Sequence, residues 1–356
     1  MKLSSLIRPG VALTLATVLI AAGCGDSDSP VAGESSSTTQ PAATTTASVD
    51  VPDGIVVAAG LNDPDDPNIA VLEFMPETVS VEVGTPVEWE WSGTEPHSVT
   101  FQAEGETRPA PGSPEESALF GPTPPTGDYD GTALANSGLQ PLGPTAPAPF
   151  SMTFAEPGTY SYFCVIHPAM TGEVTVVAAG EDSDDPASVA ERRASDQAKF
   201  LKEGRDLKAD FVAAPPVSAK NADGTTTWTV QMGTTSEHTD VLAFSPTPAD
   251  IKAGDTVTYL NESGAPHTAS FFGAGAEPIN NPVDPKVAPP APGPSPQTLS
   301  SEGFFNTGML PPNAPPGSGP PEAARSFSFV VPTAGSYAYV CILHVSSQMV
   351  GTITAA

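Results

Sequence analysis

The chain has 356 residues, of which 39% are hydrophobic, and it contains 42 Pro and 32 Gly. This length suits two domains better than one, and so much proline and glycine excludes a helical bundle and favours short strands with long connections. The formal net charge of −28 excludes nucleic acid as a partner, because like charges repel. Such an acidic surface suits either a basic partner protein or simple solubility.

The first part of the chain, residues 1–23, predicts a targeting segment. After a basic start, the apolar run Val11–Ala22 is too short to span a bilayer, which indicates a removable signal peptide. The small residues before Cys24 resemble a bacterial lipobox, which implies lipidation of Cys24 and a membrane anchor. An ordinary secretory signal with an incidental cysteine is the alternative. Residues 24–52 are rich in Ser, Thr, Ala and Asp and predict a disordered tether.

Residues 53–180 and 210–356 repeat each other. Five blocks recur in the same order at an offset of about 170 residues, too long for a solenoid period. The blocks pair Phe74–Gly84 with Phe244–Gly254, Pro86–Trp91 with Thr256–Asn261, Pro96–Phe101 with Pro266–Phe271, Asn136–Leu139 with Asn306–Met309, and Ser151–Cys164 with Ser326–Cys341. Apolar and polar residues alternate within these blocks, which is typical of strands in an antiparallel sandwich. The sequence predicts an all-β fold of two tandem Greek-key β-sandwich domains.

Residues 181–209, between the two copies, predict a helical linker. Asp185 is a candidate N-cap, Pro186 suits the first helical position, and Gly204 is a candidate C-terminal residue. Six of the 13 Lys and Arg residues lie between Arg192 and Lys208. We expect this basic charge to rest against an acidic face of a domain.

Two Pro-rich segments, Ala103–Pro149 and Ala274–Arg325, are longer than ordinary loops in compact domains. We expect them to lie over the sandwiches. They either cover the end that holds the metal or are ordinary surface insertions.

Each copy carries one cysteine, two histidines and one methionine in a shared pattern. The first reads Cys-x2-His-x2-Met with one histidine upstream, and the second reads Cys-x2-His-x4-Met with one histidine upstream. A thiolate, two imidazoles and a weak thioether form the blue-copper ligand set, because they combine soft and borderline donors that suit both Cu(I) and Cu(II). The candidate ligands of the two copper ions are His97, Cys164, His167 and Met170 in the first copy, and His267, Cys341, His344 and Met349 in the second.

Other interpretations of these residues are weaker. A Cys164–Cys341 disulfide would leave four histidines unexplained. Zinc could fill such a site in vitro, but methionine is a poor zinc ligand. One of the sites could be degenerate, although neither lacks a ligand.

The segment Tyr160–Met170 resembles the ligand loop of amicyanin-type cupredoxins, and Cys341–Met349 is similar to that of plastocyanin. The resemblance covers residues 53–180 and 210–356 and implies one type 1 (blue) copper site in each. Plastocyanins usually place an Asn after the first ligand histidine, where this chain has Ser98 and Thr268. Because hydrogen bonds near the sulfur tune the reduction potential, this departure bears on the exact potential and not on copper binding.

In this family, the histidine on the cysteine loop reaches the surface through an apolar patch, where electrons pass. The resemblance therefore implies a redox partner protein that docks near His167 or His344. Tandem cupredoxins also build copper oxidases and nitrite reductases, but these need extra histidines. Only His238 remains here, either as a solvated surface residue or as an accessory metal ligand. The sequence thus predicts an extracytoplasmic, lipid-anchored electron carrier, with an enzyme or a copper storage or delivery protein as alternatives.

Overall fold

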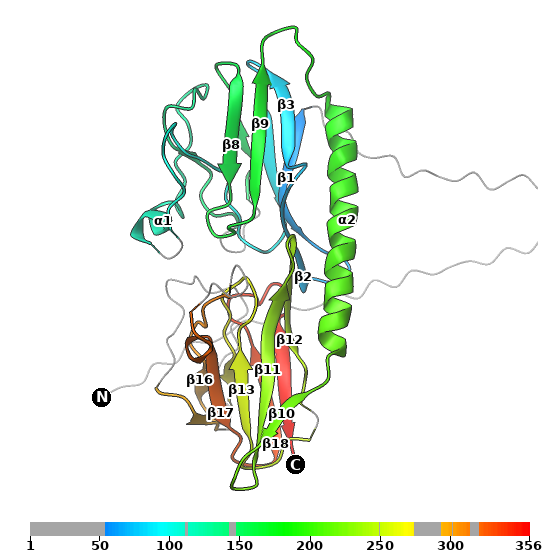
Figure 1. Ribbon diagram of the computed structural model, residues 1–356, viewed down its shortest axis with the longest axis vertical. Coiled ribbons are helices and arrows are strands. Elements are labelled where there is room, and N and C mark those ends of the chain that lie inside the picture. Colours follow the sequence, from blue (N-terminus) through cyan, green and yellow to red (C-terminus); the bar gives the residue numbers. More distant parts are fainter. Residues whose placement is uncertain are drawn as a thin grey trace, which may run out of the picture. The chain divides into compact units, whose positions relative to one another are not determined.

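The computed structural model describes residues 54–110, 113–141, 147–248, 250–273, 293–300, 302–313 and 320–356. The predicted signal peptide, the predicted tether and Cys24 lie outside these residues, as does half of the second Pro-rich segment. Strands dominate the described residues (Figure 1). No helix among them is long and apolar enough to cross a membrane.

The first half is a sandwich of two sheet layers. One layer has the strand order β2-β1-β4-β7 and the other β3-β9-β8-β5-β6. The short helix α1 (Pro114–Ala118) follows β5 and precedes β6 in the chain. The strands are β1 (Ile55–Asn62), β2 (Ile69–Met75), β3 (Thr78–Glu82), β4 (Val87–Ser92), β5 (Thr100–Phe101), β6 (Ala135–Asn136), β7 (Phe150–Met152), β8 (Gly158–Phe163) and β9 (Thr171–Val177). Alternate residues face inward, as in β3, where Val79 and Val81 are buried. The core centres on the aromatic rings of Trp89, Phe101 and Tyr162.

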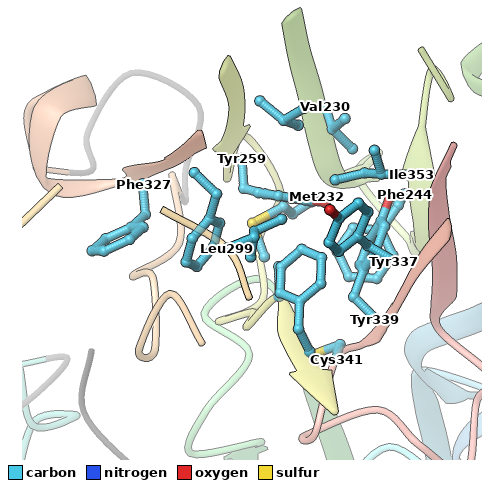
Figure 2. Close-up of a cluster of buried hydrophobic side chains, with 14 of the residues drawn as sticks. Val230, Met232, Phe244, Tyr259, Leu299, Phe327, Tyr337, Tyr339, Cys341 and Ile353 are labelled. Atoms are coloured by element: carbon cyan, nitrogen blue, oxygen red, sulfur yellow. The ribbon is translucent and has the colours of Figure 1, made fainter. Parts of the chain in front are cut away.

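The second half repeats this arrangement. Its layers have the strand orders β15-β17-β13-β11-β12 and β16-β14-β18-β19, with β10 paired to β11. The elements are β10 (Val217–Lys220), β11 (Thr226–Thr235), β12 (Thr239–Ser245), β13 (Thr256–Leu260), β14 (Ser270–Phe272), β15 (Gln297–Thr298), β16 (Phe304–Asn306), the 3-10 turn η2 (Glu322–Ala324), β17 (Ser326–Val330), β18 (Gly335–Val340) and β19 (Val350–Ala355). Within its core, Tyr259 packs against the rings of Phe271, Phe329 and Tyr339, and Cys341 lies at one edge of the cluster (Figure 2). The all-β sandwich prediction is confirmed.

Two features of the sheets differ from the sequence-based prediction. The sheets are mixed rather than antiparallel throughout, because β1 pairs with β4, and β3 with β9, in parallel. These partners are not consecutive in the chain, so no hairpin forces them to run in opposite directions. In addition, β2 pairs with β12, with Ala70 opposite Asp240, so one sheet continues through both halves. The repeated blocks carry no information about contacts between the two halves, so the sequence did not predict this pairing.

The connection between the halves is the long helix α2 (Pro186–Ala213). Its start is as predicted, because the Asp185 side chain accepts hydrogen bonds from the backbone N–H groups of Ala187 and Ser188. The prediction that Gly204 ends the helix is wrong. Gly204 lies inside α2, where a Cβ atom would collide with Cγ2 of Ile69 on β2. The glycine therefore serves close packing of helix on sheet instead of a cap.

The basic charge of α2 does rest against acidic residues, as predicted. The Arg205 guanidinium contacts the buried Asp63 carboxylate at 2.5 Å, and Lys208 contacts Asp66 at 2.6 Å. Near the start of the helix, Arg193 lies 3.7 Å from the carboxylate of Glu90 on β4. The pKa of Asp63 is lowered chiefly by its hydrogen bond to Arg205. These contacts attach α2 to the first half along much of its length.

Candidate metal centres

The first His/Cys/His group lies at one end of the first sandwich. His97 precedes β5, Cys164 follows β8, and His167 lies on the loop beyond. Nδ1 of His97 lies 3.0 Å from Nδ1 of His167, and Cys164 Sγ lies 3.4 Å from His167 Nδ1 and 4.0 Å from His97 Nδ1. The structure thus brings together three predicted ligands from two places far apart in the sequence.

The second group has the same geometry. Nδ1 of His267 lies 3.1 Å from Nδ1 of His344, and Cys341 Sγ lies 3.3 Å and 3.8 Å from His344 and His267 Nδ1, respectively. These two triads are the groups of three His, Cys, Asp or Glu side chains in the described residues that could hold a metal ion.

The spacing of each triad fits a transition-metal ion. In both triangles, the point equidistant from the three donor atoms lies about 2 Å from each, the ordinary length of a bond from imidazole nitrogen to such a metal. Met170 and Met349 are fully buried at the ends of the same loops, which close through Cys164 N–H to Met170 C=O and Cys341 N–H to Met349 C=O. All eight predicted ligands are therefore buried or half-buried around two loops.

In each triad, the histidines lower the pKa of the cysteine thiol. Burial by itself would raise the pKa of Cys164, but its neighbours His167 and His97 lower it well below the ordinary thiol range. The same holds for the pKa of Cys341 beside His344 and His267. Both thiols are free, so the structure contradicts the disulfide alternative.

The residue after each upstream histidine ties the two ligand segments together. The Ser98 backbone N–H donates to Cys164 Sγ at 3.4 Å, and its hydroxyl accepts from the Val165 N–H at 2.9 Å. Thr268 makes the equivalent bonds to Cys341 and Ile342, at 3.4 Å and 3.0 Å. Ser98 and Thr268, which depart from the plastocyanin pattern, thus fix the ligand loop through their hydroxyls and donate to the cysteine sulfur through their backbone N–H groups.

Two glycines that the sequence analysis did not single out make room for the upstream histidines. Gly60 and Gly233 lie at bulges in β1 and β11, with φ of 72° and 78°. A Cβ at Gly60 would collide with the His97 ring, and one at Gly233 would lie 2.7 Å from His267 Nε2. Their recurrence at equivalent places in the two copies was the available signal.

The outer nitrogens of the histidines have different partners in the two groups. His267 Nε2 lies 2.8 Å from the Ser263 hydroxyl, and His344 Nε2 lies 3.3 Å from the carboxylate of Glu95, which belongs to the first half. His97 Nε2 is buried with no partner in the described structure. His344 is 5% exposed, whereas His167 is half-buried. The two centres therefore differ in their surroundings more than in their donor atoms.

Arg108, in the first Pro-rich segment, holds the first ligand loop. Its guanidinium donates to the backbone carbonyls of Cys164 at 2.6 Å, Val165 at 2.7 Å and Pro168 at 3.0 Å, and lies over the Phe163 ring. This part of the segment therefore covers the metal end of the first sandwich. Residues 274–292 of the second segment lie outside the described residues.

The fifth histidine, His238, belongs to neither group. Its Nδ1 lies 3.1 Å from the Glu203 carboxylate on α2, and its ring stacks on Phe200. It is half-buried between a helix and a strand, so it is not the solvated surface residue that was one of the two expectations.

A β-sandwich that closes a buried His/Cys/His group at one end defines a class of mononuclear metal proteins. The family of copper-binding proteins that comprises plastocyanin and azurin matches residues 65–177. A plastocyanin from Scenedesmus fuscus is 33% identical over 126 residues, which are 35% of this chain and 96% of that protein. The chain therefore belongs to the plastocyanin/azurin family of cupredoxins. Membership supports copper-mediated electron transfer as its general function.

Solved structures of amicyanin are also similar. An oxidised mutant is 23% identical, covers 36% of this chain and 86% of its own, and has a TM-score of 0.23. A reduced mutant is 24% identical, with coverages of 36% and 87% and a TM-score of 0.23. Because these TM-scores are low, the assignment of the chain to its family rests on the sequence matches alone.

Proposed function

We propose that this chain is an extracytoplasmic electron carrier with two mononuclear type 1 copper sites. The observation that carries the proposal is the pair of buried His/Cys/His triads, each closed by a loop that ends in a buried methionine. When bound, copper supplies a one-electron couple between Cu(I) and Cu(II).

The residues of the chain would hold the metal in a rigid, dry pocket. Cys164 and Cys341 contribute thiolates, the four triad histidines contribute Nδ1, and Met170 and Met349 close the two loops. Hydrogen bonds from Ser98 and Thr268 and the close approach of Gly60 and Gly233 keep these donors in place. Because the donors cannot move far, little rearrangement would accompany a change of charge.

A carrier is favoured over an enzyme by the use of the histidines. A catalytic copper cluster needs further donors, and within the described residues the two triads take four of the five histidines. The fifth, His238, is engaged by Glu203 and Phe200.

We further propose that a lipid on Cys24 anchors the protein to the extracytoplasmic face of a membrane. Support comes from the lipobox-like residues before Cys24 and from the tether-like composition of residues 24–52. Replacement of Cys24 by Ser should move the protein from the membrane fraction to the soluble fraction of the producing cell. A Cys24→Ser protein that stays in the membrane fraction would rule out this anchor.

A redox partner protein is proposed to dock near His167. The ring of His167 is half-buried, and Ile166 and Pro168 beside it are half-buried and exposed, so a partner could approach this loop. His344, the other predicted docking point, has its outer nitrogen against Glu95 and is almost fully covered. The observations thus favour the first site as the point of exchange with a partner.

Copper quantitation with an optical spectrum tests the proposal. The purified chain should bind two copper ions and absorb intensely at about 600 nm, in the thiolate-to-copper charge-transfer region. Cys164→Ser and Cys341→Ser should each remove one blue centre and leave the other, while Cys24→Ser should change neither the copper content nor the spectrum. A copper-loaded chain without this absorption would contradict the proposal.

A further inference from the structure

A charged side chain of opposite sign contacts each of the two centres: a carboxylate at the second and a guanidinium at the first. The carboxylate of Glu95 lies 3.3 Å from Nε2 of His344 at the second centre. The guanidinium of Arg108 donates to the carbonyls of Cys164 and Val165 at the first. Glu95 also faces His167 and His97 of the first centre, but its strongest interaction is with His344, so the two charges should shift the two centres apart from each other.

The position of Glu95 is fixed by contacts between the two halves. Glu95 is 5% exposed, and Oε1 accepts from the Ser347 hydroxyl at 3.4 Å. Ser347 in turn contacts the Thr94 hydroxyl at 2.8 Å, and its carbonyl accepts from Asn68 at 2.6 Å. A first-half loop thus holds the second-half ligand loop, with the carboxylate directed at a ligand histidine.

The two halves do not repeat these two charged residues. Aligning Pro96-His97 with Pro266-His267 places Ala265 opposite Glu95, so the second half offers no carboxylate at the equivalent position. Arg108 is the single basic residue between Asp53 and Gly180. Among the described residues, no Lys or Arg side chain hydrogen-bonds to residues 341–349 of the second ligand loop.

A buried anion stabilises a doubly charged metal ion more than a singly charged one, and a cation does the reverse. Building on the proposed function, we propose that Glu95 lowers the reduction potential of the second centre and Arg108 raises that of the first, so that an electron on the chain settles at the first centre. Glu95 and Arg108 act here as positioning and charge-setting residues, because neither is a metal ligand.

The proposed transfer would move one electron from the second centre to the first. The second centre is oxidised, the first is reduced, and no proton moves and no bond breaks. Glu95 contacts His344 and lies two residues before His97, so it joins the ligand segments of both centres. The half-buried His167 of the first centre then gives the electron access to a partner, whereas His344 is covered.

A redox titration of the full chain loaded with two copper ions tests this order, read by absorbance and electron paramagnetic resonance. The Cys164→Ser and Cys341→Ser variants assign each spectrum to its centre. We expect the first centre to be reduced first, with an equilibrium constant of at least about tenfold for the transfer, which is about 59 mV for one electron.

Charge variants separate the two contributions. Glu95→Gln keeps a hydrogen-bonding side chain and should favour reduction of the second centre by about tenfold, and Arg108→Gln should disfavour reduction of the first by a similar factor. The controls Glu88→Gln, at the start of β4, and Lys202→Gln, on α2, remove the same charges elsewhere and should shift neither centre. Arg108→Lys keeps the charge and should retain most of the potential of the first centre.

The outcomes distinguish this inference from the proposed function. Two blue centres with equal potentials, or with the second centre reduced first, would overturn the inference and leave the carrier function intact. An Arg108→Lys shift as large as that of Arg108→Gln would overturn the charge argument at the first centre. Loss of the blue absorption in the unmodified chain would instead overturn the proposed function.

Discussion

Gly60 on β1 lies directly against the ring of His97, so closely that a Cβ atom at position 60 would overlap the imidazole. The bulge at Gly60 and its positive φ of 72° bring the strand backbone to this position. The upstream ligand histidine is thus held by a bare backbone on one side and by its ligand partners on the other.

We therefore expect Gly60→Ala to weaken copper binding at the first centre by about tenfold or more, because the added methyl group would displace the His97 ring. The second centre should keep its copper. Gly84→Ala is the matched control, because Gly84 also has a positive φ, of 84°, but has nothing within 4 Å of its Cβ position. Copper stoichiometry by competition with a chelator measures both. Equal losses in the two variants would point to backbone strain alone.

The hydroxyl of Ser98 predicts a stability effect. Ser98→Ala leaves the buried Val165 N–H without its acceptor, which should lower the free energy of unfolding by about 1–3 kcal/mol. Ser98→Thr should be close to neutral, since Thr268 plays the same role in the second half. Urea unfolding of the copper-free protein gives both values. A Ser98→Thr variant as unstable as Ser98→Ala would show that the hydroxyl is not the cause.

Gly204 in α2 predicts an inverted helix-propensity effect. Alanine normally stabilises a helix interior relative to glycine by about 1 kcal/mol. Here the added methyl meets Ile69, so Gly204→Ala should instead destabilise the protein by about 1–3 kcal/mol. Thermal unfolding of Gly204→Ala, Ile69→Ala and the double variant tests this as a cycle. Additive losses, with no relief in the double variant, would contradict the close-packing explanation.

Glu73 should make the stability of the protein depend on pH. Burial, followed by repulsion from Glu77, Glu237 and Glu203, raises the pKa of Glu73 from 4.5 to about 8. The folded state thus binds this proton more tightly than the unfolded state does, so stability falls as pH rises from about 4.5 to about 8. The loss should be roughly 1–3 kcal/mol after allowance for water reaching the carboxyl.

Glu73→Gln should therefore match the unmodified protein near pH 4 and exceed its stability at pH 8 and above. The exposed Glu156→Gln is the control and should follow the unmodified protein at both pH values. Urea unfolding at the two pH values measures the difference. If Glu73→Gln gained no stability at pH 8, the carboxyl would not be the source of the dependence.

Several features were predictable because they depend on local sequence. Cys164, His167 and Met170 lie on one short loop, and the same is true of Cys341, His344 and Met349, so spacing alone indicated the donor sets. The period-two blocks indicated the strands, and Asp185 with Pro186 indicated the start of α2. The mixed sheets and the position of Gly204 were not predicted, because strand order and helix packing depend on partners far away in the chain.

By itself, the sequence determined the candidate ligand residues, the duplication and the all-β class, because each is a pattern of neighbours along one chain. Only the tertiary structure decided which charged groups surround each centre. The contacts of Glu95 with His344 and of Arg108 with the Cys164 loop join residues that no spacing rule connects, since they arise from the packing of one half, or one long loop, on another. Charge acts through space, so the environment of each metal site depended on the folded arrangement rather than on the motif.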